Sequence, residues 1–117
     1  MSPRIVVAGY CASGKSTLVD RLRSDGVEAS AVAQEHSVID DLWDHYSPDI
    51  VIFLDVTVEA IRKRRGNPNW PEWIYELQTE RLAAARERAD IVVDTTKSDA
   101  GETYRQVCMH LGITPSQ

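Results

Sequence analysis

Glycine, lysine and serine residues near the amino terminus of this sequence have a spacing that could bind a polyphosphate. The stretch IVVAGYCASGKST fits the pattern G-x-x-x-x-G-K-[ST] at every fixed position. Gly9 and Gly14 let the backbone bend so that successive N–H groups can point inward, toward an anion at the start of a helix. Lys15 adds a positive charge for the β- and γ-phosphates, and Ser16 can ligate a magnesium ion that bridges them.

The loop therefore predicts binding of a nucleoside triphosphate with Mg²⁺, and ATP is the expected nucleotide. The sequence itself does not distinguish ATP from GTP. The expected contacts to the nucleotide come from the loop and from the end of the last strand: Gly9, Cys11, Ala12, Ser13, Gly14, Lys15, Ser16, Thr17 and Thr95.

Composition restricts the class of protein. The chain has 117 residues, which is enough for one domain spanning residues 1–117, and its 43% apolar and 26% charged residues are typical of a soluble globular protein. A net charge of -5 argues against a protein that binds nucleic acid by broad electrostatic attraction. No apolar stretch approaches the ~20 residues needed to span a bilayer. We expect no membrane association and a cytoplasmic location.

The two cysteines, Cys11 and Cys108, are too few for a disulfide framework, and we expect both to be free thiols. Cys11 lies in the loop near the amino end of a helix, where the pKa of a thiol can be lowered. Sensitivity of Cys11 to oxidation is a secondary hypothesis.

Short apolar runs and capping residues predict alternating strands and helices. Ser37 with Asp40 resembles a capping box, Thr57 can cap the next helix, and Ser98 or Thr96 can cap the last one. Strands are expected at residues 4–9, 27–33, 49–56 and 91–93, and helices at residues 16–23, 37–46, 58–65, 71–89 and 100–111.

This alternation predicts an α/β fold: a three-layer sandwich with a short parallel sheet of about four strands and helices on both faces. Ligands bind at the carboxyl ends of such strands. Glu35, His36, Asp55 and Thr95 should therefore lie on the same edge as the loop.

Three of these residues are candidates for catalysis or metal binding. Glu35 could hold the magnesium ion or orient the attacking group, or it could be a solvated loop acid. Asp55 follows a buried apolar run and could also bind the metal, or it could have a structural role where the strand ends. His36 could accept a proton from an acceptor alcohol, or it could be a hydrogen-bonded loop residue.

Basic residues at the end of the helix 58–65 are candidates for charge stabilisation. Arg62 and Arg65 share a helix face, so we expect these two to reach the phosphates. Alternatively, the basic run is a solvated helix end that offsets the helix dipole. Trp70 and Trp73 could cover the site or pack in the core.

The chain resembles the small P-loop kinases, a family that includes shikimate kinase, adenylate kinase, thymidylate kinase and dephospho-coenzyme A kinase. The resemblance is carried by the loop GYCASGKST, by a strand ending in FLDV that leads into the arginine-containing helix, and by the run RLAAARERADIVVDTT. It implies the P-loop NTPase fold and transfer of the γ-phosphoryl group of ATP to a small molecule. With four strands, the order expected from the resemblance is 27–33, 4–9, 49–56 and then 90–94. The resemblance also implies that residues 62–73 form a lid-like segment, whose closure would bring Arg62 and Arg65 to the phosphates. It also implies that Arg81 contacts the acceptor and that Thr95, Thr96 and Lys97 lie at the adenine.

The chain is shorter than these kinases usually are. The missing part lies between the first helix and the central strand, where the acceptor-binding region and one βα unit would be. Three readings follow: the remaining residues bind a small acceptor, a second subunit completes the site in a homodimer, or the chain binds or slowly hydrolyses a nucleotide and acts through a partner. An ATPase that assists nucleic-acid processing is disfavoured by the acidic charge balance.

Overall fold

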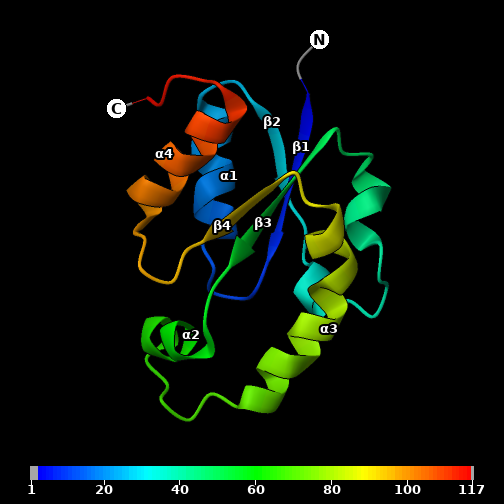
Figure 1. The fold of residues 1–117 in the computed structure, drawn as a ribbon, viewed down its shortest axis with the longest axis vertical. Coiled ribbons are helices and arrows are strands. Elements are labelled where there is room, and N and C mark those ends of the chain that lie inside the picture. Colours follow the sequence, from blue (N-terminus) through cyan, green and yellow to red (C-terminus); the bar gives the residue numbers. More distant parts are fainter. Residues whose placement is uncertain (1–2, 117) are drawn as a thin grey trace.

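The computed structural model describes residues 3–116 and has four parallel strands between two layers of helices (Figure 1). The strand order is β2-β1-β3-β4, which confirms the predicted order. The strands are β1 Arg4–Gly9, β2 Glu28–Ala31, β3 Ile50–Asp55 and β4 Ile91–Asp94, and the helices are α1 Lys15–Ser24, α2 Val58–Arg65, α3 Glu72–Arg88 and α4 Ala100–Leu111.

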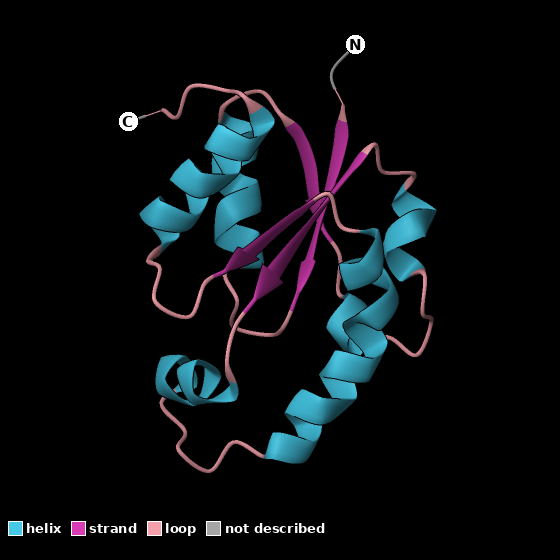
Figure 2. Cartoon of the chain, in the orientation of Figure 1, coloured by secondary structure: helices cyan, strands magenta, loops and turns pink. Residues whose placement is uncertain are grey.

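Each face of the sheet has its own hydrophobic core, because successive side chains of a strand point to opposite faces. Helices α1 and α4 cover one face and pack on Val7 and Ile52, while α2 and α3 pack over the other face, on Val6 and Phe53. Figure 2 shows the resulting three layers, with helices on both sides of the strands. The predicted α/β architecture with helices on both faces is therefore confirmed.

The two central strands end at the same level. Their register places Gly9 of β1 opposite Leu54 of β3. Both strands are almost completely buried, since every residue from Ile5 to Gly9 and from Val51 to Leu54 is classed as buried. The turn after β1 and the residues after β3 therefore lie together at the carboxyl edge of the sheet.

The predicted helix at residues 37–46 is wrong. The chain forms two short 3-10 helices there, at Gln34–His36 and Leu42–Tyr46. The buried amide of Gln34 donates to the carbonyl oxygen of Ile39 and accepts from the backbone N–H of Trp43, which holds the segment in an irregular path. The hydroxyl of Ser37 accepts from the N–H of Ile39 and so does not form a capping box with Asp40.

Other boundaries differ from the prediction only slightly. β2 is shorter than expected, and α3 begins immediately after Pro71. Thr57 caps α2, as predicted, by accepting from the N–H of Ala60. The cap of α4 is Asp99, whose carboxylate accepts from the N–H of Glu102, so neither Ser98 nor Thr96 has the predicted role.

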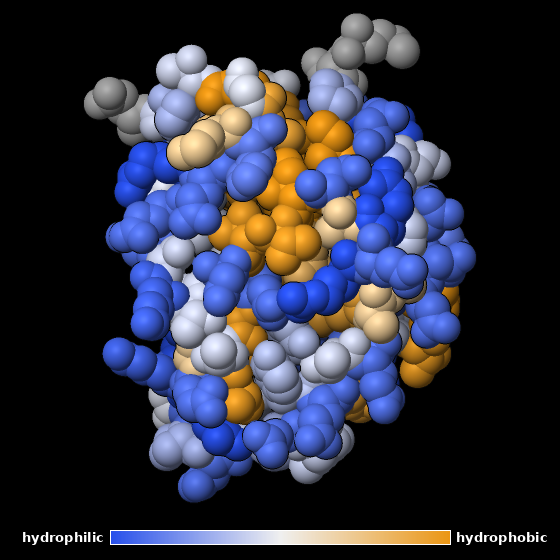
Figure 3. All heavy atoms as spheres, viewed as in Figure 1, coloured by the Kyte–Doolittle hydropathy of each residue, from blue (hydrophilic) through white to orange (hydrophobic). Residues whose placement is uncertain are grey.

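Part of the edge strand β4 lies under an apolar area of the surface. Figure 3 shows a central hydrophobic patch bordered by hydrophilic residues, at the place where β4 lies nearest the viewer in Figure 1. Val92 of β4 is 47% exposed. Within residues 3–116, no helix has both the length and the apolar character needed to cross a membrane.

The close contact between β1 and β3 generates a prediction for Gly9. A Cβ atom at this position would lie 2.5 Å from the carbonyl oxygen of Leu54, which is backbone and has little freedom to move. We expect Gly9→Ala to lower the free energy of unfolding by about 1–3 kcal/mol, measured by urea denaturation.

Gly101→Ala is the matched control, because Gly101 lies in α4 and the nearest atom to its added Cβ is the flexible end of Arg105, at 3.2 Å. This substitution should be neutral or should stabilise the protein by up to about 1 kcal/mol. Equal destabilisation by both substitutions would contradict the proposed contact.

Candidate functional site

The turn between β1 and α1 forms a compact loop with left-handed backbone at two positions. Gly14 has φ +99°, and Ala12 has φ +58°, which costs an alanine roughly 1–2 kcal/mol. Within the loop, the N–H of Ser13 donates to the carbonyl oxygen of Tyr10 at 3.2 Å. The first N–H groups of α1 follow directly, and they have no partner inside the helix because the helix begins there. N–H groups at the amino end of a helix are available to an anion, so the turn leaves donors free at this edge of the sheet.

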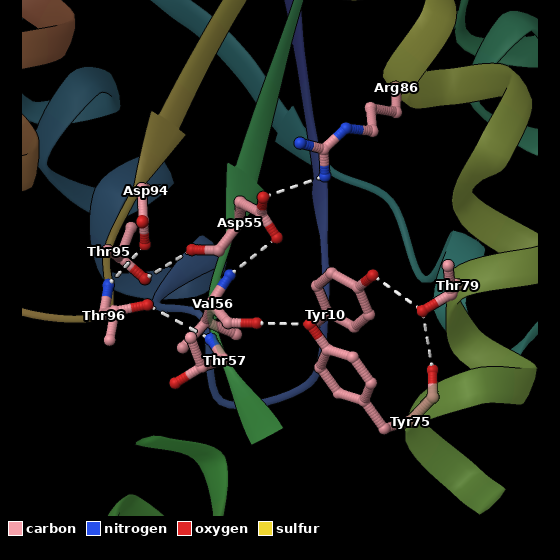
Figure 4. Close-up of polar contacts among 10 residues, drawn as sticks. All are labelled: Tyr10, Asp55, Val56, Thr57, Tyr75, Thr79, Arg86, Asp94, Thr95 and Thr96. Atoms are coloured by element: carbon pink, nitrogen blue, oxygen red, sulfur yellow. Dashed lines mark hydrogen bonds and ion pairs between the residues drawn. The ribbon is translucent and has the colours of Figure 1, made fainter. Parts of the chain in front are cut away.

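Helix α3 holds the loop from the side. Tyr10 stacks on Tyr75 with ring centroids 4.5 Å apart, and its hydroxyl is 2.8 Å from that of Thr79 (Figure 4). The buried side chain of Gln78 accepts from the N–H of Cys11 at 3.1 Å. Burial, together with the neighbouring Tyr10, raises the pKa of the Tyr75 hydroxyl far above its ordinary value, so the hydroxyl stays protonated and donates to the carbonyl oxygen of Val56.

Lys15 and Glu35 form a buried ion pair at the loop. Lys15 Nζ lies 2.5 Å from Glu35 Oε2, and the two side chains are only 12% and 4% exposed. The same ammonium group also donates to the carbonyl oxygens of Gly9, at 3.0 Å, and Tyr10, at 2.9 Å. These three contacts use all three hydrogen atoms of the ammonium group.

Glu35 also lies next to both predicted acceptor-binding residues. A guanidinium nitrogen of Arg81, on α3, is 3.4 Å from the carbonyl oxygen of Glu35. His36 Nε2 lies 3.9 Å from Glu35 Oε2, and the imidazole is 63% exposed. The structure therefore brings Glu35, His36 and Arg81 together. A cavity of about 540 Å³ lies on this side of the loop, and its lining includes Cys11, Ser16, Thr17 and Glu35.

Side chains beside the loop include oxygen atoms of the kind that could ligate a magnesium ion. Two buried side-chain oxygens have no hydrogen-bond partner among residues 3–116, namely Ser13 Oγ and Glu35 Oε1. Ser13 lines the cavity on the other side of the loop, and Glu35 lines the cavity that also contains Ser16. The hydroxyl of Ser16 and the carboxylate of Glu35 line the same cavity and are oxygen ligands of the kind that Mg²⁺ prefers. Within the described residues, no group of three or more His, Cys, Asp or Glu side chains could hold a metal ion.

Asp55 does not share the surroundings of Ser16 and Glu35, contrary to its prediction as a metal ligand. One of its carboxylate oxygens is 2.8 Å from a guanidinium nitrogen of Arg86, and the other accepts from the N–H of Val56 (Figure 4). Both carboxylate oxygens therefore have partners that fix the end of β3. This arrangement matches the structural alternative for Asp55.

Thr95 lies on the other side of the loop, in a cavity of about 230 Å³ between the loop and the amino end of α4. Its buried hydroxyl donates to the carbonyl oxygen of Asp55 at 3.0 Å. The next turn is shaped by Asp94, whose carboxylate accepts from the N–H of Thr96. Hydrogen bonds from the hydroxyl and the N–H of Thr96 lower the pKa of Asp94. Lys97 is exposed and does not line this cavity.

The arginine that reaches the loop is Arg64, whereas the prediction named Arg62 and Arg65. Arg64 donates to the carbonyl oxygen of Ala12 at 2.8 Å and to the carbonyl oxygen of Thr95. Arg62 donates to the carbonyl oxygen of Trp70, and the Arg65 guanidinium lies 5.8 Å from the centre of the Trp70 ring. Arg62 and Arg65 do share one side of α2, as expected, but this side faces the loop that follows the helix.

The lid-like segment, residues 62–73, is mostly exposed and is anchored to the protein by one buried side chain, that of Trp70. Trp70 is only 5% exposed and belongs to the same hydrophobic core as Ile61, which supports the core-packing alternative for this residue. Trp73 is 64% exposed. The cysteines are both free: Cys11 is half-buried at the loop, and burial raises the pKa of the Cys108 thiol.

Sequence reasoning missed Arg64, Gln78, Tyr75 and Thr79. Gln78 had a usable signal, because a glutamine on the apolar side of a helix needs a hydrogen-bond partner if it is buried. The neighbouring residues Tyr75 and Thr79 carried no such signal.

Arg64 supports a testable prediction about the loop. Arg64→Met removes the donors to Ala12 and Thr95. We therefore expect the N–H of Ser13 to exchange with solvent roughly fivefold faster. This factor corresponds to a loss of about 1 kcal/mol of local stability, the contribution of a partly exposed hydrogen bond from a charged group. Amide hydrogen exchange measured by NMR checks this. Arg65→Met is the control and should leave the exchange of Ser13 unchanged; equal acceleration by both variants would show that the Arg64 contact does not hold the loop.

No protein-family model matches this chain, and no curated protein matches it significantly. Three features of the structure bear on function: the Gly9–Ser16 loop, the Lys15–Glu35 ion pair and the two cavities beside the loop.

Proposed function

We propose that this chain binds the Mg²⁺ complex of a nucleoside triphosphate, with ATP as the expected nucleotide, and transfers its γ-phosphoryl group to a small-molecule acceptor. The observation that carries this proposal is the loop with its Lys15–Glu35 ion pair, flanked by one cavity on each side. The loop supplies amides and an ammonium group for the phosphates, while the cavities leave room for a base on one side and an acceptor on the other.

The nucleotide would enter with its base on the side of Thr95. The smaller cavity is lined by Ala12, Ser13 and Thr17 from the loop and α1, and by Arg64 and Thr95 from across the sheet edge. The aliphatic atoms of these side chains and the guanidinium plane of Arg64 suit an aromatic base. The phosphates would then lie over the N–H groups at the start of α1, with Lys15 beside them.

The metal would be held by Ser16 and Glu35, which line the same cavity, and its remaining ligands would include phosphate oxygens. Bound there, Mg²⁺ would neutralise the charge that develops on the phosphates during transfer. Asp55 is not part of this proposal, because Arg86 and Val56 occupy its carboxylate.

The acceptor would approach from the side of His36 and Arg81. Its hydroxyl oxygen forms a bond to the γ-phosphorus while the bond from that phosphorus to the β–γ bridging oxygen breaks, and the diphosphate leaves. The hydroxyl proton passes to His36 or to water. Arg81 is half-buried and close to Glu35, where it can fix an acceptor by charge and hydrogen bonding. Catalysis of this kind rests mainly on positioning and charge stabilisation.

One observation favours the alternative class, a nucleotide-binding or slowly hydrolysing module that acts through a partner. The segment between β2 and β3, where an acceptor-binding region would be, contains only the two short 3-10 helices within the described residues. In this alternative the loop, Lys15 and Ser16 keep their roles, and water replaces the acceptor.

Phosphorus NMR distinguishes these functions. The protein is incubated with Mg²⁺-ATP and a pooled mixture of small metabolites, beside Lys15→Ala and, as a matched control, Lys63→Ala, which removes an exposed lysine of α2. We expect a new phosphoester resonance with the wild type and with Lys63→Ala, and its loss by at least about 100-fold in rate with Lys15→Ala, because one charge contact to the developing phosphoryl charge is lost.

The other outcomes decide against phosphoryl transfer to a metabolite. Inorganic phosphate alone, lost in Lys15→Ala, would identify an NTPase. Shifted nucleotide resonances with no turnover would identify a binding module. A wild type that leaves the nucleotide resonances unchanged would overturn the proposed nucleotide site itself.

A further inference from the structure

Lys15 has no free donor in this structure. Its ammonium group is shared among the carbonyl oxygens of Gly9 and Tyr10 and the carboxylate of Glu35. A phosphate oxygen that takes a hydrogen bond from Lys15 must therefore replace one of these three partners. Glu35 is the partner that carries a full negative charge, so the exchange that matters electrostatically is between Glu35 and the incoming phosphate.

Glu35 depends on Lys15 for its charge balance. Its side chain is 4% exposed, and an unpaired carboxylate at such a depth is strongly unfavourable. The Arg81 guanidinium contacts the backbone carbonyl of Glu35, not its carboxylate. The imidazole of His36 is 3.9 Å away and 63% exposed, so solvent weakens its effect. Neither group can take over from Lys15 as the close counter-charge.

A polyphosphate that arrives without a metal thus has two unfavourable effects. It draws Lys15 away from Glu35, and it places further negative charge beside a buried carboxylate whose second oxygen already lacks a partner. A polyphosphate that arrives with Mg²⁺ brings a positive charge that can balance Glu35. The same carboxylate therefore opposes the metal-free ligand and favours the metal-loaded one.

We propose that Glu35 is the specificity-determining residue that makes this site select metal-loaded over metal-free polyphosphate, through exchange of its ion pair with Lys15. This inference rests on the proposed function, because it assumes that the loop is a phosphate site. It goes further because it assigns the preference for metal-loaded polyphosphate to one residue. It also predicts whether removal of the Glu35 charge strengthens or weakens binding, both with and without metal.

The test uses inorganic triphosphate as the probe, so that no base contributes to binding, and isothermal titration calorimetry as the readout. Binding is measured with excess magnesium chloride and, separately, with a chelator. Glu35→Gln keeps the size of the side chain and an acceptor for Lys15 but removes the charge. Glu28→Gln is the matched control, since Glu28 is exposed and lies at the start of β2, at the opposite end of that strand from the loop.

We expect opposite changes in the two conditions. Without metal, Glu35→Gln should bind triphosphate roughly tenfold more tightly than the wild type, because the competing charge on Lys15 has gone; with magnesium it should bind roughly tenfold more weakly. Glu28→Gln should match the wild type in both conditions. Thermal denaturation of each variant without ligand shows whether it is folded. If Glu35→Gln is unstable, Glu35→Asp is the second variant; it retains the charge and should keep the preference for the metal-loaded ligand.

Affinity that falls in both conditions, or does not change in either, would overturn the role of Glu35 while leaving the phosphate site intact. A wild type that does not bind triphosphate even with magnesium would overturn both this inference and the proposed function.

Discussion

The close approach of Gly9 to the carbonyl oxygen of Leu54 fixes the position of everything at the carboxyl edge of the sheet. The two central strands are buried and end side by side, so the chain can leave β1 only by turning immediately. A side chain at Gly9 would collide with the backbone carbonyl of Leu54, so packing alone accounts for the glycine at this position. The turn then delivers Lys15 and the first amides of α1 to the same edge as the ends of β2 and β3.

Helix α3 is the second support of the site. Gln78 and Thr79 hold Cys11 and Tyr10 of the loop, while Arg81, less than one turn further along, holds the backbone of Glu35. Because Leu82 and Ala85 of the same helix are buried against the sheet, these polar contacts are attached to the hydrophobic core. The loop and the carboxylate that pairs with Lys15 are therefore positioned by one helix.

The sequence was sufficient for those parts of the structure that local patterns determine. The apolar runs and the spacing of Gly9, Gly14 and Lys15 led to the parallel sheet and to the loop at its carboxyl edge, and the resemblance to small P-loop kinases led to the strand order. The neighbourhood of Glu35, His36 and Arg81 also followed from the strand order and the resemblance to kinases. The roles of these residues stay predictions.

The parts that could not be predicted depend on tertiary contacts. On α2, Ile61 faces the core, and Arg64 and Arg65 flank it on opposite sides, so the direction in which α2 leaves the sheet decides which arginine meets the loop. The segment at residues 37–46 had a plausible cap, but the buried amide of Gln34 competes for its backbone groups. Asp55 had the pattern of a metal ligand, and only the position of Arg86, thirty-one residues later, shows that its carboxylate is already paired.

The loop and Glu35, which would form the two walls of the proposed phosphate site, are both attached to α3, and this has a thermodynamic consequence. Conformational entropy is lost once, when the helix packs on the sheet, and the loop and Glu35 become ordered in the same event. Little freedom then remains for a ligand to remove on arrival. Binding at such a preorganised site is governed by electrostatic exchange and desolvation, since the entropic cost of ordering the protein has already been met by folding.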